Sequence, residues 1–314
     1  MPMKRIKSKL DLFQLRLRLM QSKQTNTQQK ERILMSVIQV GLVDTTNKLD
    51  KQLVQSVAAA LNIQVIRDLQ QYWNVKATVI HLSDPKKIPA GVWPVNLVAK
   101  LPPGEGGVHL DKHNQPYSLV IATPNSDEWT IDASHETIEM LVDPQGSRLQ
   151  SSTAIGIVGD KIEDTAGQFN YLVEACDPCE ADQYAYSIQG VAVSDFITPH
   201  FYDPVTTTGT RYSFAGNIQA PRQILPGGYI SFIDLETEEW EQILWIDPNK
   251  PPTLNDLGPA PAGQSLRVWV DAVIAQYREE KLLKRVPNRP LMERCRKHRA
   301  KLDKIATRRA KLYS

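Results

Sequence analysis

The chain has 314 residues, of which 41% are hydrophobic and 23% are charged, and its formal net charge is +2. This composition is typical of a soluble globular protein, and no apolar run approaches the ~20 residues that a membrane-spanning helix needs. Three cysteines are too few for a disulfide framework, which favours a reducing compartment. We expect a cytoplasmic or particle-associated protein.

Charge is concentrated at the two ends of the chain. Residues 1–32 hold nine Lys or Arg against two acids, and residues 276–314 hold fourteen against four, so the stretch between them carries −15. Basic and apolar residues alternate at the start without the long apolar run of a signal peptide, so no secretion signal is evident. The N-terminal basic arm has three candidate partners: a membrane surface, nucleic acid, or the acidic body of the same or a neighbouring chain.

The first half of the body alternates helix and strand signals. A helical pattern covers residues 48–73, and strand-like runs follow at 77–82, 93–100 and 117–122. A Gly-rich loop at residues 102–110 separates the last two runs. We expect this loop to be an ordinary connection that leaves His109 and His113 exposed to solvent. The alternative is that both histidines approach the cleft of the site described next, since the glycines would let the backbone come close to a ligand.

The most informative segment is residues 132–144, which the pattern predicts as a helix. On a helix, His135 and Glu139 lie one turn apart on one face, the spacing of two metal ligands. Glu136 follows the first ligand and is positioned to act as a general base towards water. Asp132 or Ser134 would cap the helix start, and Asp143 before a proline would end it. A solvated acidic helix face is the alternative, but the neighbouring residues are mostly apolar.

A third ligand is expected from the acidic segment at residues 174–182. Glu180 is the first choice, and Asp177 and Glu174 come next, because carboxylate oxygen binds zinc. An acidic, solvated turn is the competing interpretation. Cys176 and Cys179 supply two thiols of a Cys-x-x-Cys pair, which is too few ligands for a structural zinc site and lacks the setting of a redox motif.

The second half of the chain indicates more strands and a helical tail. Strand-like runs occur at 188–196, 228–233 and 242–246, with a turn at Gln189-Gly190. Residues 247–264 are rich in proline and predict an extended connection. Residues 265–314 predict helices broken near residues 286–290, and the last of them is very basic. Few aromatic residues interleave these charges, so the tail is either solvated or binds phosphate without reading sequence.

Around residues 36–182 the chain resembles the zincin-type metallopeptidases, through His135-Glu136 and the order of the preceding elements. The resemblance implies an α+β fold over residues 33–246, with a mixed sheet before the active-site helix. The charge pattern adds basic helical arms at both termini. The resemblance also implies a zinc ion, or another divalent metal, bound by His135, Glu139 and Glu180, with Glu136 as the base of a peptide hydrolase. Glu139 stands where the family has a second His, and an anionic ligand makes the metal less Lewis acidic. The alternative function is therefore a non-catalytic, degenerate peptidase fold with a structural or assembly role.

Overall fold

The computed structural model describes residues 37–102, 106–247, 249–263, 265–280 and 285–313. The predicted basic arm at residues 1–32 lies outside this range. The described chain has an α+β fold with two five-stranded sheets, a short hairpin and several helices, so the predicted fold class is confirmed at that level. No helix in the described ranges combines the length and the apolar character needed to cross a membrane.

The first sheet is mixed and has the strand order β2-β1-β3-β5-β4. Its strands are β1 (Ile38–Asp44), β2 (Ala77–Leu82), β3 (Val92–Val98), β4 (Gly107–Lys112) and β5 (Gln115–Ile121). β1, β3 and β5 are parallel, whereas β4 is an antiparallel edge strand. The mixed sheet was expected, but residues 107–110, predicted as loop, are in β4. Pairing with β5 gives their backbone groups partners that the Gly-rich sequence did not indicate.

One continuous helical segment follows β1, as predicted. It consists of α2 (Lys51–Ile63), the π-helical turn η1 (Gln64–Leu69) and α3 (Gln70–Trp73). The Asp50 carboxylate caps its start by accepting a hydrogen bond from the Gln52 amide. The segment ends where Asn74 adopts a left-handed conformation.

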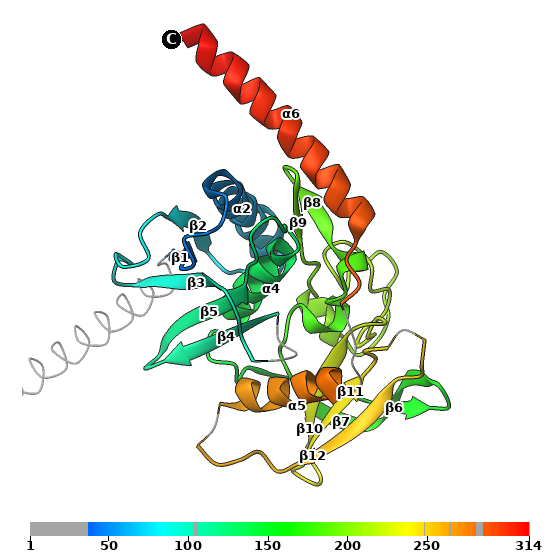
Figure 1. Ribbon diagram of the computed structural model, residues 1–314. Helices are drawn as coiled ribbons and strands as arrows, with labels where there is room; N and C mark the ends of the chain where they lie inside the picture. Colours follow the sequence, from blue (N-terminus) through cyan, green and yellow to red (C-terminus); the bar gives the residue numbers. More distant parts are fainter. Residues whose placement is uncertain (1–36, 103–105, 248, 264, 281–284, 314) are drawn as a thin grey trace, which may run out of the picture. The chain divides into compact units, whose positions relative to one another are not determined.

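Helix α4 (Trp129–Val142) carries the predicted site and is packed on every side. It lies against β5 and β4 (Figure 1), and all its side chains except Asp132 are buried. The helix ends at Asp143, as predicted. The predicted start was wrong, because the helix begins at Trp129 and neither Asp132 nor Ser134 caps it. Ser134 is instead a buried link, since its hydroxyl donates to Gln64 and accepts the Ser194 amide proton.

The second sheet is antiparallel and has the order β12-β11-β10-β7-β6. Its strands are β6 (Leu149–Val158), β7 (Lys161–Leu172), β10 (Tyr229–Asp234), β11 (Trp240–Leu244) and β12 (Thr253–Gly258). Residues 253–258 were predicted as part of an extended connection, but they pair with β11. Pairing with a neighbour thus overrode the weak local strand propensity of this Pro-rich stretch.

Short elements lie between β7 and β10, two strands of the second sheet. They are η2 (Asp177–Cys179), η3 (Asp182–Tyr184), β8 (Tyr186–Ile188), β9 (Val191–Val193) and η4 (Pro199–Tyr202). β8 and β9 form a hairpin whose turn is Gln189-Gly190, as predicted, with both residues at positive φ. A Cβ at Gly190 would lie 2.8 Å from the Arg299 backbone nitrogen, so this turn needs glycine.

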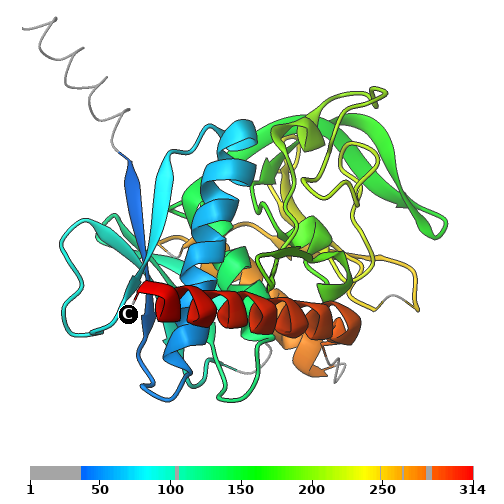
Figure 2. The ribbon, with the colours of Figure 1, turned by 90° about the horizontal axis from the view of Figure 1, so that it is seen from above.

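Two helices complete the described chain: α5 (Leu266–Glu280) and α6 (Arg289–Tyr313). α5 packs on the second sheet, where Val270 contacts Leu172 and Trp240 in one apolar cluster. The first turns of α6 are anchored by Leu291, Met292 and Cys295, which form a cluster with residues of α4 and β9. Farther along, Gln52 of α2 donates to Asp303, where the red and blue helices cross in Figure 2.

Candidate metal centre

His135 and Glu139 meet on one face of α4, as the helical spacing predicts. The His135 Nε2 atom lies 3.1 Å from Glu139 Oε2. The Cys176 amide donates to the other Glu139 oxygen at 2.9 Å, which ties the helix to the segment before η2. The Glu139 side chain is completely buried, whereas that of His135 is 11% exposed. Access to this pair is therefore from the His135 side.

The downstream carboxylate closest to this pair is Asp177, the second choice from the sequence. Its Oδ1 atom lies 3.2 Å from His135 Nε2, and the side chain is buried. Glu180, the first choice, belongs with His135 and Asp177 to one group of neighbouring donors. However, the Glu180 carboxylate also forms an ion pair with Arg278 of α5.

The backbone of Gly228 fixes the position of η2. A Cβ on this glycine would lie 2.5 Å from the Asp177 carbonyl oxygen and 2.8 Å from two backbone atoms of Pro178. Real Cβ atoms do not approach backbone so closely. The start of β10 can therefore press against η2 only because residue 228 has no side chain.

Glu136 lies near β4, in one donor group with His109 and Glu139. Its Oε2 atom lies 3.7 Å from His109 Nδ1, and His109 Nε2 lies 3.1 Å from the Asp143 carbonyl oxygen. The expectation of an exposed His109 was wrong, because the residue is 1% exposed and lies in β4 facing α4. The approach is close, since a Cβ at Gly107 would lie 2.7 Å from Glu136 Cγ.

Arg267, at the start of α5, is the cation of this cluster. One guanidinium nitrogen lies 2.7 Å from Glu139 Oε2, another forms an ion pair with Glu174, and Nε lies 2.7 Å from Asp271. All three partners of the arginine are carboxylates, and its side chain is 3% exposed. Burial and then the charge of Arg267 lower the pKa of His109 to about 4, so that ring is neutral near pH 7.

Sequence reasoning missed Arg267 as a member of the cluster, and for His109 it favoured an exposed loop over an approach to the site. Arg267 had a signal, because it interrupts the apolar residues 266–270 of α5 and has Asp271 one turn later. A charged residue within such a run needs a partner if it is buried. His109 had no comparable signal, since it was placed in a loop.

The charges in the cluster shift one another strongly. Burial opposes ionisation of Glu139, but Arg267 and His135 together lower its pKa well below the ordinary value. Burial and then the charge of Glu139 raise the pKa of Asp177 well above its ordinary value. Burial raises the pKa of Glu136 to about 7. Burial also opposes the charged form of His135, yet Glu139 and Asp177 raise its pKa well above normal. The ionisation of each of these groups therefore changes the pKa of its neighbours.

The donor set and its spacing fit a divalent metal ion. The described residues contain four overlapping groups of three donors, and within each group the donor atoms lie within 4.8 Å of one another. The groups are His135, Glu139 and Cys176; His109, Glu136 and Glu139; His135, Asp177 and Glu180; and Glu139, Glu174 and Asp177. Two ligands of a tetrahedral zinc ion, each about 2.1 Å from the metal, lie roughly 3.4 Å apart. The 3.1 and 3.2 Å distances from His135 Nε2 are close to this value. Neither Asp177 oxygen has a hydrogen bond of good geometry among the described residues, although Oδ1 lies 3.2 Å from His135 Nε2, so both oxygens have lone pairs free for a metal.

Cys176 and Cys179 are free thiols buried beside the cluster. Burial raises the pKa of both well above the ordinary value, so the thiol is the stable form. The Cys176 sulfur also lies near the His135 carbonyl oxygen, at 3.8 Å. Within this arrangement Cys176 belongs to one donor group, whereas Cys179 belongs to none of those in the described chain.

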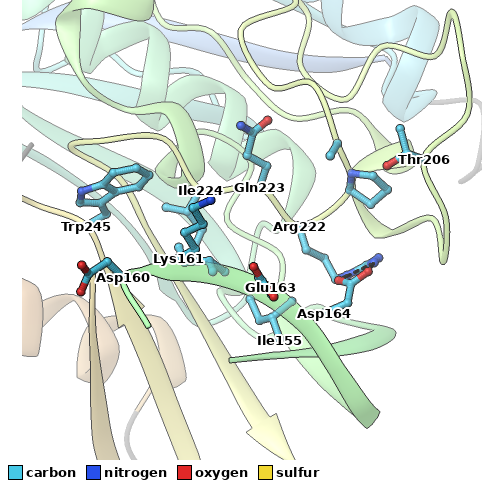
Figure 3. Close-up of a pocket in the computed structure, with 13 residues that line it drawn as sticks. Ile155, Asp160, Lys161, Glu163, Asp164, Thr206, Arg222, Gln223, Ile224 and Trp245 are labelled. Carbon is cyan, nitrogen blue, oxygen red and sulfur yellow. Dashed lines mark hydrogen bonds and ion pairs between the residues drawn. The ribbon is translucent and has the colours of Figure 1, made fainter. Parts of the chain in front are cut away.

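A surface hollow lies elsewhere on the protein, and no residue of the cluster lines it. It has a volume of about 390 Å³ and lies between β7 and the loop that contains Arg222 (Figure 3). The buried cation among the residues that line it, Arg222, is already paired within the protein. The Arg222 guanidinium contacts both Asp164 oxygens at 2.9 Å and donates to Ser152 at 2.8 Å. The residues that could hold a metal therefore gather in the buried cluster and not in this hollow.

Comparison with known proteins does not place the chain in a family. No protein-family model matches it, and no curated protein or solved structure matches it significantly.

Proposed function

We propose that this protein is a zinc-dependent hydrolase that cleaves peptide bonds with water. One observation carries the proposal: His135 Nε2 stands between Glu139 and Asp177 at distances near those of neighbouring metal ligands, and both Asp177 oxygens are buried without a good hydrogen bond. A His nitrogen with carboxylate oxygens is a common zinc donor set. The proposed ligands are His135, Glu139 and a downstream carboxylate, for which Asp177 is better placed than Glu180.

The remaining residues of the cluster have distinct proposed roles. Zinc supplies Lewis acidity, which makes water acidic enough to react near neutral pH and polarises a carbonyl oxygen. Glu136 accepts the proton of the attacking water and passes it to the leaving nitrogen, as the new carbon–oxygen bond forms and the carbon–nitrogen bond breaks. Arg267 offsets the charge of Glu139 and Glu174, so the cluster holds its carboxylates together despite their repulsion.

The surroundings of α4 support this proposal. An antiparallel edge strand, β4, lies directly beside the helix that carries the base and two ligands. The resemblance to zincins implies such a strand along the substrate cleft. Near the proposed ligands, the side chains of His135, Glu180 and Asp132 are 11%, 14% and 21% exposed, and Asp271, beside Arg267, is 13% exposed. A substrate would approach from the His135 side of the cluster.

The proposal is tested by hydrolysis of a mixture of internally quenched peptides. The full chain is stripped with a chelator, reloaded with zinc and compared with its Glu136→Gln variant and with Glu163→Gln, an exposed control on β7. We expect Glu136→Gln to lower the rate at least about a hundredfold while zinc stays bound, since general bases contribute on that scale. The control should keep its rate. Equal rates for Glu136→Gln and the wild type would refute the role of Glu136.

The contacts of Arg267 support a second, non-catalytic function. This guanidinium already neutralises Glu139 and Glu174, and most of the cluster is closed to solvent. These features suit a non-catalytic protein in which the cluster is a structural element of an assembly component. The two functions differ in one outcome: a zinc-loaded chain that hydrolyses none of the peptides would support the non-catalytic function.

A further inference from the structure

Helix α6 presents a continuous basic stripe that the proposed hydrolase does not use. Its residues recur at intervals of three and four, which keeps them on one face of a helix. They are Arg294, Lys297, Lys301, Lys304, Arg308 and Lys311. All six are exposed. From the first to the last, the stripe is about 26 Å long at a rise of 1.5 Å per residue.

The opposite face of α6 is held on the protein. Leu291, Met292 and Cys295 are buried, and at about 100° per residue they lie across the helix from the stripe. Arg296 and Arg299 flank this anchored face, and both form ion pairs with Asp127 at 2.7 Å. The stripe therefore faces away from the surface on which the helix is docked.

The acids of α6 do not cancel the stripe. Asp303 lies on the body side, where its carboxylate accepts a hydrogen bond from Gln52 at 3.1 Å. Glu293 is at the edge of the stripe and pairs with Lys297 at 2.6 Å. The stripe from Lys301 to Lys311 has no acid on its own face. This half of the helix therefore has a net positive surface.

We propose that this basic stripe binds the phosphate backbone of a nucleic-acid duplex without reading its sequence. Cations spaced along one rigid face neutralise successive phosphates, and the stripe is as long as about 8 base pairs. The α6 sequence has a single aromatic residue, Tyr313 at its end, so it offers no platform on which single-stranded bases could stack.

A membrane surface fits the stripe less well. An interfacial helix buries a broad apolar face in the lipid headgroup region. On α6, the apolar residues Leu291, Met292 and Cys295 are already buried against α4 and β9. Among the α6 side chains whose burial the structure describes, the large exposed apolar ones are Leu302 and Ile305, 38% and 48% exposed. Phosphate contacts are therefore favoured over insertion into lipid.

The test measures fluorescence anisotropy of a labelled duplex of about 20 base pairs between about 50 and 200 mM salt. The full chain is compared with a stripe variant and with a control variant that loses the same charge elsewhere on the body. The stripe variant is Lys301→Gln, Lys304→Gln, Arg308→Gln. The control variant is Lys48→Gln, Lys86→Gln, Lys161→Gln, all at exposed positions. Because residues 1–36 are intact in all three proteins, their contribution cancels in the comparison.

We expect the stripe variant to bind the duplex at least about tenfold more weakly at the lowest salt, with the salt slope reduced by about 2.7, or 0.9 for each lost cation. The control should change affinity less than about twofold. Unchanged far-ultraviolet circular dichroism and melting temperature would exclude misfolding as the cause. Equal losses for both variants, or no duplex binding by the wild type, would overturn the proposal. Binding to anionic phosphatidylserine vesicles without binding to the duplex would also overturn it.

Discussion

The cluster beneath α4 and the stripe on α6 are both dense in charge, but they differ in burial. In the cluster His135, Glu139 and Arg267 have neighbours of opposite sign within hydrogen-bonding distance, and Glu139 is completely buried. On the stripe every side chain is exposed, and the docking of α6 depends on other residues. Burial makes a charge depend on its internal partners, whereas exposure leaves it available to an external one. The two regions should therefore respond to mutation in opposite ways.

The largest difference is expected from removing an arginine in each region. Arg267→Met leaves the buried Glu139 and Glu174 and the partly buried Asp271 without their shared cation, so we expect a loss of about 3–5 kcal/mol in the free energy of unfolding. Arg309→Met, at an exposed position of α6, should change it by less than about 0.5 kcal/mol. Urea unfolding followed by tryptophan fluorescence measures both. Similar small losses would show that the cluster does not depend on Arg267.

A second change tests the packing that shapes the cluster. In Gly228→Ala the new methyl group would collide with the backbone of Asp177 and Pro178, so η2 must move. We expect a loss of about 1–3 kcal/mol from overpacking, together with weaker zinc binding. Gly156→Ala is the matched control, because its new methyl group would meet only the side chain of Thr165, at 3.1 Å. If both variants keep their zinc affinity, the position of η2 does not control the metal site.

A third change tests how α6 is anchored. Burial opposes ionisation of Asp127, but Arg296 and Arg299 lower its pKa below the ordinary value. Its stabilising effect is therefore present above the unfolded pKa of about 3.9 and is lost as pH falls through the lower folded value. We expect Asp127→Asn to lower the stability by about 1–3 kcal/mol at pH 7. The difference in melting temperature between the two proteins should shrink towards pH 3. A difference that is constant with pH would exclude these ion pairs as its cause.

The smallest effect on stability is expected at the stripe itself. Its side chains are exposed and have no role in docking α6, so Lys304→Gln with Arg308→Gln should change the free energy of unfolding by less than about 0.5 kcal/mol. Urea unfolding again provides the measurement. A loss above about 1 kcal/mol would mean that the stripe supports the fold and would weaken its assignment to a partner.

Local patterns predicted the elements that depend on local physics. The helical spacing of His135 and Glu139, the end of α4 at Asp143 and the Gln189-Gly190 turn all follow from neighbouring residues. β12 and His109 could not be predicted in this way, because distant strands supply their partners. The same holds for Arg267, which reaches the cluster from a helix more than a hundred residues beyond Glu139. Spacing within a helix is readable from sequence, whereas the closing of a cluster by long-range packing is not.

The choice of third ligand shows the same limit. Sequence alone ranked Glu180 above Asp177. Both are acids in one turn, so the residue types do not distinguish them. The 3₁₀ turn of η2 directs Asp177 to His135 Nε2, and α5 brings Arg278 to Glu180. Which acid faces the His therefore depends on a backbone turn and on a distant helix, neither of which is visible in the spacing of residues.

The most direct test of the account is the zinc content of the purified protein, measured by elemental analysis after dialysis. The wild type and Glu163→Gln should carry about one zinc per chain, and Glu139→Ala and Asp177→Ala should lose it. Glu180→Ala should keep most of the metal if Asp177 is the third ligand. A wild type without zinc or any other divalent metal, or full retention by Glu139→Ala, would contradict the assignment of this cluster as a metal centre.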